Sequence, residues 1–269
     1  MRFLSSKEFG DVVILGVPFD STTCFRPGAR FGPDGIRFFS ENLEEFSPSL
    51  KKSLASVEFT DAGNVEVPAD PEGMVDAVYS FLKEKEITFP VVLGGDHSVT
   101  YPVVKYLAEK VQKLTVVHFD AHADLRNEYS GTPFSHACVM RRVLDLGVDI
   151  VQVGIRSMTE EEFSLRKESD RITTVERLEE LPALLSQIKS PVYFTVDIDF
   201  FDPAFAPGTG TPEPCGASPV DFFETLYKLP TVEVLGFDVV EVSPPYDPSG
   251  ITQALGAKIV REFILKFWG

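Results

Sequence analysis

Short apolar runs with the character of strands recur along the chain and alternate with segments of helical periodicity. The strand-like runs cover residues 12–17, 91–93, 114–119, 150–155, 192–196 and 232–239. The helical segments cover residues 71–85, 101–111, 137–146, 175–187, 219–229 and 251–267. Continuously apolar strands that alternate with helices are typical of a parallel sheet covered by helices on both faces. The pattern predicts one α/β domain over residues 1–269, without a linker or an internal repeat.

Polar side chains gather where three of these apolar runs end. Six potential metal ligands follow the three runs: His97, Asp120, His122, Asp124, Asp197 and Asp199. Side chains alternate between the two faces of an extended chain, so Asp120, His122 and Asp124 are expected to point the same way. In parallel sheets ligands bind at the carboxyl ends of the strands. The sequence therefore predicts that four carboxylates and two imidazoles converge at one edge of the sheet.

Four carboxylates at one place need compensating positive charge. Two like charges about 5 Å apart repel by roughly 3 kcal/mol at an effective dielectric of 20, so six pairs would cost on the order of 10–20 kcal/mol. The whole stability of a domain is only about 5–15 kcal/mol. Oxygen donors outnumber nitrogen donors here, which favours manganese over zinc. Six ligands suit two ions that share bridging carboxylates and hold a hydroxide between them.

Aspartate is also common as a helix cap or turn residue, so one Asp-x-Asp motif alone would carry little weight. All four histidines of the chain lie in these segments or just beyond them: His97, His118, His122 and His136. This coincidence favours metal binding. His118 precedes the end of its strand, so we expect it to pack against a ligand or support one.

Composition narrows the class of protein. The net charge of −16 argues against nucleic acid as a partner and suits a cationic ligand, although acidity alone can also serve solubility. No apolar stretch is long enough for a membrane helix, and residues 1–8 lack the features of a signal peptide. Three widely spaced cysteines predict neither a disulfide framework nor a zinc ribbon, so a reducing cytoplasm is expected.

The polar segments closely resemble those of the ureohydrolase family, which includes arginases, agmatinases and formiminoglutamases. The matching stretches are residues 16–20, 26–33, 94–98, 118–124, 197–210, 238–242 and 244–258. The resemblance implies a three-layer α/β/α sandwich around a mainly parallel, eight-stranded sheet. It further implies two Mn²⁺ ions per chain and a trimer or hexamer. By the same resemblance, the first Mn²⁺ ion would bind His97, Asp120, Asp124 and Asp197, and the second would bind Asp120, His122, Asp197 and Asp199.

The resemblance also assigns residues to the substrate. His136 matches the histidine that shuttles protons, which suits a side chain whose pKa lies near working pH. Glu241 matches the acid that binds the guanidinium group, with which a carboxylate forms two parallel hydrogen bonds. Thr211 and Asn127 are further candidates for substrate binding. Arg156 is expected to be structural or to lie in an interface.

The expected reaction is hydrolysis of the guanidino group of agmatine to urea and putrescine, a step of polyamine synthesis. Residues 124–129 and 135–139 are similar to those of microbial agmatinases, and Glu128 suits an ammonium group. The donors of the same loop would also suit arginine or another guanidino acid. Remoter alternatives are a deacetylase of the same fold, which would need paired histidines and one zinc, and a family member without catalytic activity. The intact ligand set and Glu241 argue against both.

Overall fold

The computed structural model describes residues 1–269, and an eight-stranded sheet forms its centre. The strands are β1 (Val12–Gly16), β4 (Phe59–Asn64), β5 (Phe89–Leu93), β6 (Thr115–Phe119), β7 (Asp149–Val153), β8 (Ile172–Val175), β9 (Val192–Asp197) and β10 (Val234–Val240). Their order across the sheet is β4-β1-β5-β10-β9-β6-β7-β8, and every neighbouring pair is parallel. The short strands β2 (Phe46–Ser47) and β3 (Lys52–Ser53) form a separate antiparallel pair.

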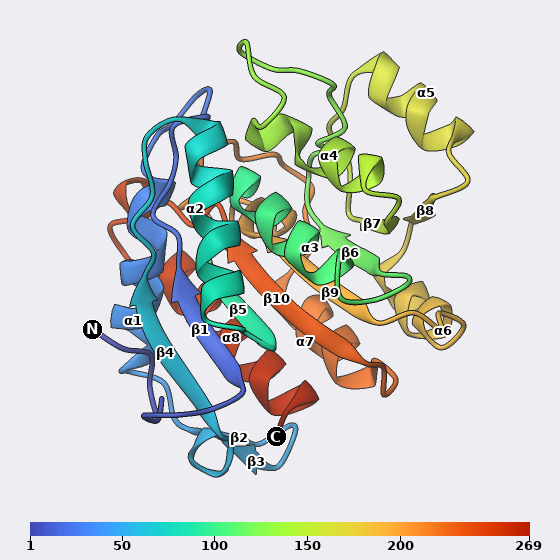
Figure 1. Ribbon diagram of the computed structural model, residues 1–269. Coiled ribbons are helices and arrows are strands. Elements are labelled where there is room, and N and C mark those ends of the chain that lie inside the picture. The colour runs from blue at the N-terminus through green and yellow to red at the C-terminus, as the bar shows by residue number, and fades with distance from the viewer.

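Helices cover both faces of the sheet (Figure 1). One face carries α2 (Pro71–Glu84), α3 (Thr100–Ala108) and α4 (Val139–Asp145), which contribute to one apolar core. The opposite face carries α1 (Gly32–Ser40), α6 (Leu181–Leu185), α7 (Pro219–Lys228) and α8 (Ile251–Phe267), which contribute to a second core. The helix α5 (Glu160–Glu168) lies beside the edge strand β8. The predicted three-layer sandwich is therefore confirmed.

The strands that the apolar pattern missed are the two edges of the sheet. Strand β4 has the sequence Phe-Thr-Asp-Ala-Gly-Asn, and β8 has only four residues with two exposed threonines. An edge strand has one unpaired flank, so it needs less apolar character than a central strand. Two helices, α1 and α5, were also not predicted, and the segment at 175–187 is helical over a shorter span, in α6.

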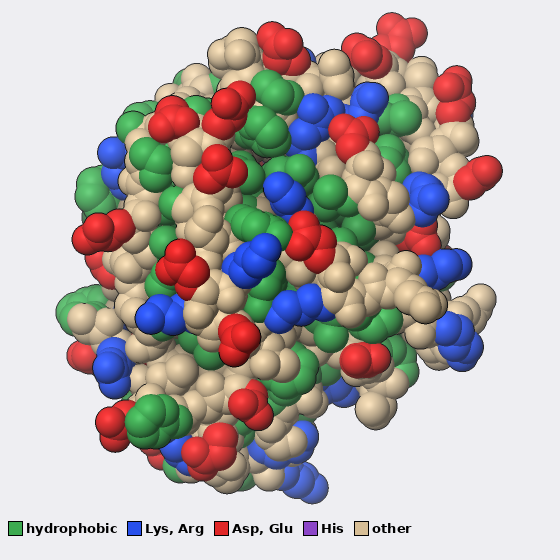
Figure 2. All heavy atoms as spheres, viewed as in Figure 1, with side chains coloured by type: hydrophobic (Ala, Val, Ile, Leu, Met, Phe, Trp, Pro, Cys, Tyr) green, Lys and Arg blue, Asp and Glu red, His purple; other side chains and the backbone are tan.

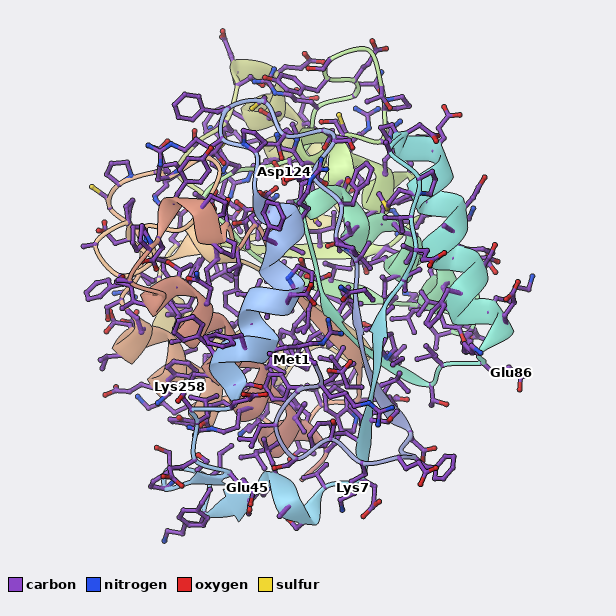
Figure 3. All side chains as sticks on the ribbon, turned by 90° about the vertical axis from the view of Figure 1, so that its left-hand side faces the viewer. Met1, Lys7, Glu45, Glu86, Asp124 and Lys258 are labelled. Atoms are coloured by element: carbon purple, nitrogen blue, oxygen red, sulfur yellow. The ribbon has the colours of Figure 1, made fainter.

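The carboxyl ends of the strands meet at the upper end of the molecule. Asp124 lies there, whereas Lys7 and Glu45 lie at the lower end (Figure 3). Acidic and basic side chains are interspersed over the face that α2 and α3 cover (Figure 2). No helix combines the length and apolar character that crossing a membrane requires.

Candidate metal centre

The predicted ligands come together at the carboxyl ends of three central strands. His97 follows β5 as the first residue of a 3₁₀ turn, Asp120 directly follows β6, and Asp197 is the last residue of β9. These three are buried, as are Asp124 and Asp199, while His122 is partly exposed. The convergence that the sequence predicted is therefore present in the fold.

The Nδ1 atom of His97 faces three carboxylates at once. It lies 3.0 Å from Oδ2 of Asp120, 3.3 Å from Oδ2 of Asp124 and 3.2 Å from Oδ2 of Asp197. This nitrogen is buried and has no hydrogen-bond partner, although acceptors surround it. A buried polar atom without a partner is costly, and a cation among these four atoms would remove that cost.

A second group of ligands adjoins the first. His122 Nδ1 lies 3.0 Å from Oδ2 of Asp199 and 3.6 Å from Oδ1 of Asp120. Ligand atoms of Asp120, His122 and Asp199 all lie within 4.8 Å of one another. Asp120 belongs to both groups, since its Oδ2 faces His97 and its Oδ1 faces His122. The donor set thus fits a pair of divalent cations with a shared carboxylate.

The pKa values in this cluster reflect its excess of negative charge. Burial raises the pKa of Asp197 well above its usual range, and the neighbouring Asp199 and Asp120 raise it further. Burial lowers the pKa of His97, but the carboxylates of Asp120, Asp124 and Asp197 outweigh it and raise this pKa well above 6.5. Buried like charges raise the pKa of an acid in this way, and a cation among the carboxylates would lower it.

The backbone brings these side chains together in a way that simple alternation did not predict. Strand β6 ends at Phe119, so Asp120, His122 and Asp124 do not lie on one face of an extended strand. Asp124 instead has a φ of 53°, in the left-handed region. Asp197 caps a 3₁₀ turn, and its Oδ1 accepts a hydrogen bond from the backbone N–H of Asp199. The convergence was predicted correctly, but the reasoning from alternation was wrong.

His118 contacts Asp120, one of the predicted metal ligands. Its Nε2 lies 2.8 Å from Oδ2 of Asp120, and Gln152 approaches its Nδ1 at 3.3 Å. Its side chain is fully buried on β6. His118 therefore orients Asp120, as expected from its position one step before the end of the strand.

A cavity of about 230 Å³ opens beside the cluster. Its wall includes four of the predicted ligands, His97, His122, Asp124 and Asp197, together with His136, Thr211 and Glu241. This volume suits a small molecule. The cavity is therefore the candidate site for a substrate.

Glu241 reaches the cavity from the end of β10. Its φ of 61° turns the chain out of the strand, and its N–H donates to Gly95 O at 2.8 Å. Its Oε1 accepts a hydrogen bond from the N–H of His97 at 2.9 Å. Burial raises the pKa of this carboxyl to about 8, and the nearby Asp96 contributes. A buried carboxylate with spare acceptor capacity is suited to a cationic group.

His136 also lines the cavity, and Thr22 holds it in place. The hydroxyl of Thr22 donates to Asp96 Oδ2 at 2.8 Å, accepts from the N–H of His136 and lies 3.1 Å from its Nδ1. Burial lowers the pKa of His136, but a hydrogen bond with Cys24 and the charges of Glu241 and Asp96 raise it to about 9. The raised pKa of His136 favours its protonated form at neutral pH.

The remaining predicted residues have different surroundings. Thr211 lines the cavity, and its hydroxyl donates to Asp199 Oδ2 at 3.3 Å. Asn127 is exposed, does not line this cavity, and accepts a hydrogen bond from Arg142 at 3.0 Å. The guanidinium of Arg156 donates to the carbonyls of Gly154, Asp199, Phe200, Glu213 and Pro214. Arg156 is thus structural, as expected.

Several residues of the cavity wall were not predicted from the sequence. Among them are Cys24, Tyr129 and Glu162. Glu162 was detectable, because Thr159-x-x-Glu162 is a capping box that marks the start of α5. Cys24 and Tyr129 carry no such signal, since only tertiary folding brings them to His136.

The sequence matches the Arginase family model over residues 10–266. The chain is 39% identical over 277 residues to an agmatinase of Bacillus subtilis, covering 98% of this chain and 96% of that protein. Two similar solved structures are an agmatine ureohydrolase of Thermoplasma volcanium and the proclavaminate amidino hydrolase of Streptomyces clavuligerus. The first has a TM-score of 0.88 and 33% identity, covering 98% of this chain and 93% of that one. The second has a TM-score of 0.88 and 34% identity, covering 99% and 97%.

Proposed function

The chain belongs to the arginase family, and from this premise we propose that it is a two-manganese hydrolase that converts agmatine and water to urea and putrescine. The observation that carries the proposal is the unpartnered His97 Nδ1, which faces three carboxylates at the edge of a small cavity. A guanidino C–N bond is the one broken.

The metal ligands are proposed as His97, Asp120, Asp124 and Asp197 for one ion and Asp120, His122, Asp197 and Asp199 for the other. Four carboxylates and two imidazoles form a hard donor set, which supports manganese over zinc. When bound, two such cations activate a water molecule for attack on the guanidinium carbon.

Glu241 and His136, which both line the cavity, have different roles toward the substrate. Glu241 binds the guanidinium through its carboxylate and orients the guanidinium carbon toward the metal ligands. The burial of Glu241 strengthens the ion pair between its carboxylate and the guanidinium. His136 is protonated at neutral pH and donates this proton to the departing amine nitrogen, so that the amine leaves as a neutral group. Thr211 is a further contact for the substrate through its hydroxyl.

The wall away from the cluster supports agmatine over arginine. Arginine would bring an α-carboxylate, which needs several donors, whereas agmatine ends in an ammonium, which needs acceptors. Asn127, one such donor, does not line the cavity, and its Oδ1 accepts a hydrogen bond from Arg142. Glu162 brings a carboxylate to the wall. Arg126 also lines the cavity and packs 5.0 Å above the ring of Tyr129, so a guanidino acid is the second candidate substrate.

Competition between agmatine and arginine in one assay of the manganese-loaded enzyme tests the choice of substrate. We expect a higher kcat/KM for agmatine. A higher kcat/KM for arginine, or turnover of guanidinobutyrate alone, would refute agmatine as the substrate and leave the metal chemistry intact. Urea release from none of these compounds would refute the proposed reaction.

We also propose a homo-oligomer that works in the reducing cytoplasm. Three free cysteines support a reducing compartment, and Phe25 and Phe38 expose 67% and 52% of their surface, which suits burial in an interface. Light scattering coupled to gel filtration measures the assembly directly. A monomer at micromolar concentration would contradict this part of the proposal.

A further inference from the structure

A chain of buried polar side chains lies behind His97, on the side opposite the carboxylates. The Nε2 atom of His97 lies 2.8 Å from the hydroxyl of Thr195 on β9. This hydroxyl lies 2.5 Å from Oδ1 of Asp238, which is paired with Thr195 across β9 and β10. Both Thr195 and Asp238 are fully buried, and neither lines the cavity. Neither side chain can therefore touch a substrate in that cavity.

The hydrogen bonds along this chain have only one consistent direction. Asp238 accepts from three hydroxyls: Thr195 donates to Oδ1, while Tyr193 and Thr100 donate to Oδ2 at 2.7 and 2.8 Å. Burial raises the pKa of Asp238, whereas its three hydroxyl donors favour the charged carboxylate, which can only accept. The single hydroxyl hydrogen of Thr195 is thus directed to Asp238. Toward His97, Thr195 can only accept, so the hydrogen of a neutral imidazole must be on Nε2.

This tautomer leaves a lone pair on Nδ1, the atom that faces Asp120, Asp124 and Asp197. A lone pair among three carboxylate oxygens is repulsive unless a cation lies between them. We propose that Thr195 and Asp238 are positioning residues that fix the tautomer of His97 and so present its Nδ1 to one of the two cations. The inference rests on the metal-dependent function proposed above.

The neighbours of Asp238 separate this role from a purely structural one. Tyr193 and Thr100 satisfy the same carboxylate, but neither forms a hydrogen bond with His97. Removing the hydroxyl of Tyr193 therefore perturbs Asp238 about as much as removing that of Thr195, while the contact with His97 stays. Outer hydrogen-bond partners of metal-bound histidines typically change metal affinity by about 10–100-fold.

The test is a Mn²⁺ titration of the full-length protein, followed by the electron paramagnetic resonance signal of the free ion. The variants are Thr195→Val, which removes the hydroxyl at nearly constant volume, Thr195→Ser, which keeps it, and Tyr193→Phe. We expect Thr195→Val to weaken one of the two ions about 10–100-fold and to leave the other nearly unchanged. Thr195→Ser and Tyr193→Phe should bind both ions within about threefold of the wild type.

Thermal unfolding of the metal-free variants provides the structural control. Equal weakening of both ions in Thr195→Val, or equal effects of Thr195→Val and Tyr193→Phe, would show a general structural role and overturn the inference. Wild-type affinity in Thr195→Val would overturn it as well. If the wild type itself binds no pair of Mn²⁺ ions, the proposed function fails first, so the two failures are distinguishable.

Discussion

Replacing Glu241 by Gln tests the proposed binding of the guanidinium group. Glu241 is only 5% exposed, and one oxygen is already occupied by the N–H of His97. The other oxygen, Oε2, lies near Gly210, where an added Cβ would approach it to 3.4 Å. The amide of Gln keeps the volume of the side chain and removes the charge.

The magnitude follows from the lost ion pair. At about 4 Å and an effective dielectric of 20, opposite unit charges attract by roughly 4 kcal/mol, part of which desolvation offsets. A net loss of about 2–4 kcal/mol lowers kcat/KM by roughly 30- to 1000-fold, since each 1.4 kcal/mol is tenfold. KM should carry much of the change, because the charge binds the guanidinium in the ground state as well as in the transition state.

Steady-state kinetics of the manganese-loaded Glu241→Gln enzyme measures this loss. Glu224→Gln is the matched control, since Glu224 is an exposed residue of α7 and changes the net charge equally. The control should keep kcat/KM within about twofold. Burial raises the pKa of Glu241 to about 8, so the free enzyme keeps this carboxyl largely protonated at neutral pH, and the cationic substrate would draw off that proton. The neutral amide of Glu241→Gln should therefore not lower the Tm. A loss in kcat/KM of less than about threefold would refute the assignment of Glu241.

Three further predictions concern the proton donor and the metals. His136→Asn should bind both ions yet lose about 100-fold or more in kcat. The kcat of the wild type should fall as pH rises through about 9, where His136 loses its proton. Loss of metal from His136→Asn would instead make His136 a ligand. Asp120→Asn should release both ions and Asp124→Asn mainly one, because Asp120 faces both His97 and His122. Elemental analysis that finds the same loss of metal in the two variants would contradict a bridging role for Asp120. The metal-free protein should lose stability as pH rises above about 4, because the pKa of Asp197 is raised in the fold and its ionisation adds unpaired charge. Mn²⁺ should therefore raise the Tm more at neutral pH than at acidic pH. A Tm that does not respond to Mn²⁺ would contradict this prediction.

Central elements of the fold could be predicted because their residues face the core on both sides. Six of the eight strands follow from continuous apolar runs, and α8 covers residues 251–267 as its periodicity indicates. The edge strands β4 and β8 could not be predicted, since their polar composition resembles that of loops. The helix α5 is almost entirely polar and is stabilised by its capping box rather than by an apolar face.

The ligand cluster could be predicted because its chemistry is visible in residue types at strand ends. Its geometry could not, because Asp124 and Glu241 adopt positive φ values that only the surrounding fold can impose. The chain from His97 through Thr195 to Asp238 was hidden for a related reason. Its members come from three strands or strand ends far apart in sequence, and nothing local marks Thr195 as more than a buried strand residue.

In the proposed binding mode, the two ends of a guanidino substrate contact different kinds of structure, which explains why the sequence indicates the reaction more clearly than the substrate. The guanidinium end would contact residues held by central strands, whose positions the sheet fixes. The other end would contact residues 125–135, whose course depends on a tight turn with Ser130 and Gly131 at positive φ. This turn places Tyr129 against His136, while Asn127 pairs with Arg142 outside the cavity. Which donors remain for an α-carboxylate is thus decided by loop contacts, and a family that varies this loop can change its substrate without altering the metal centre.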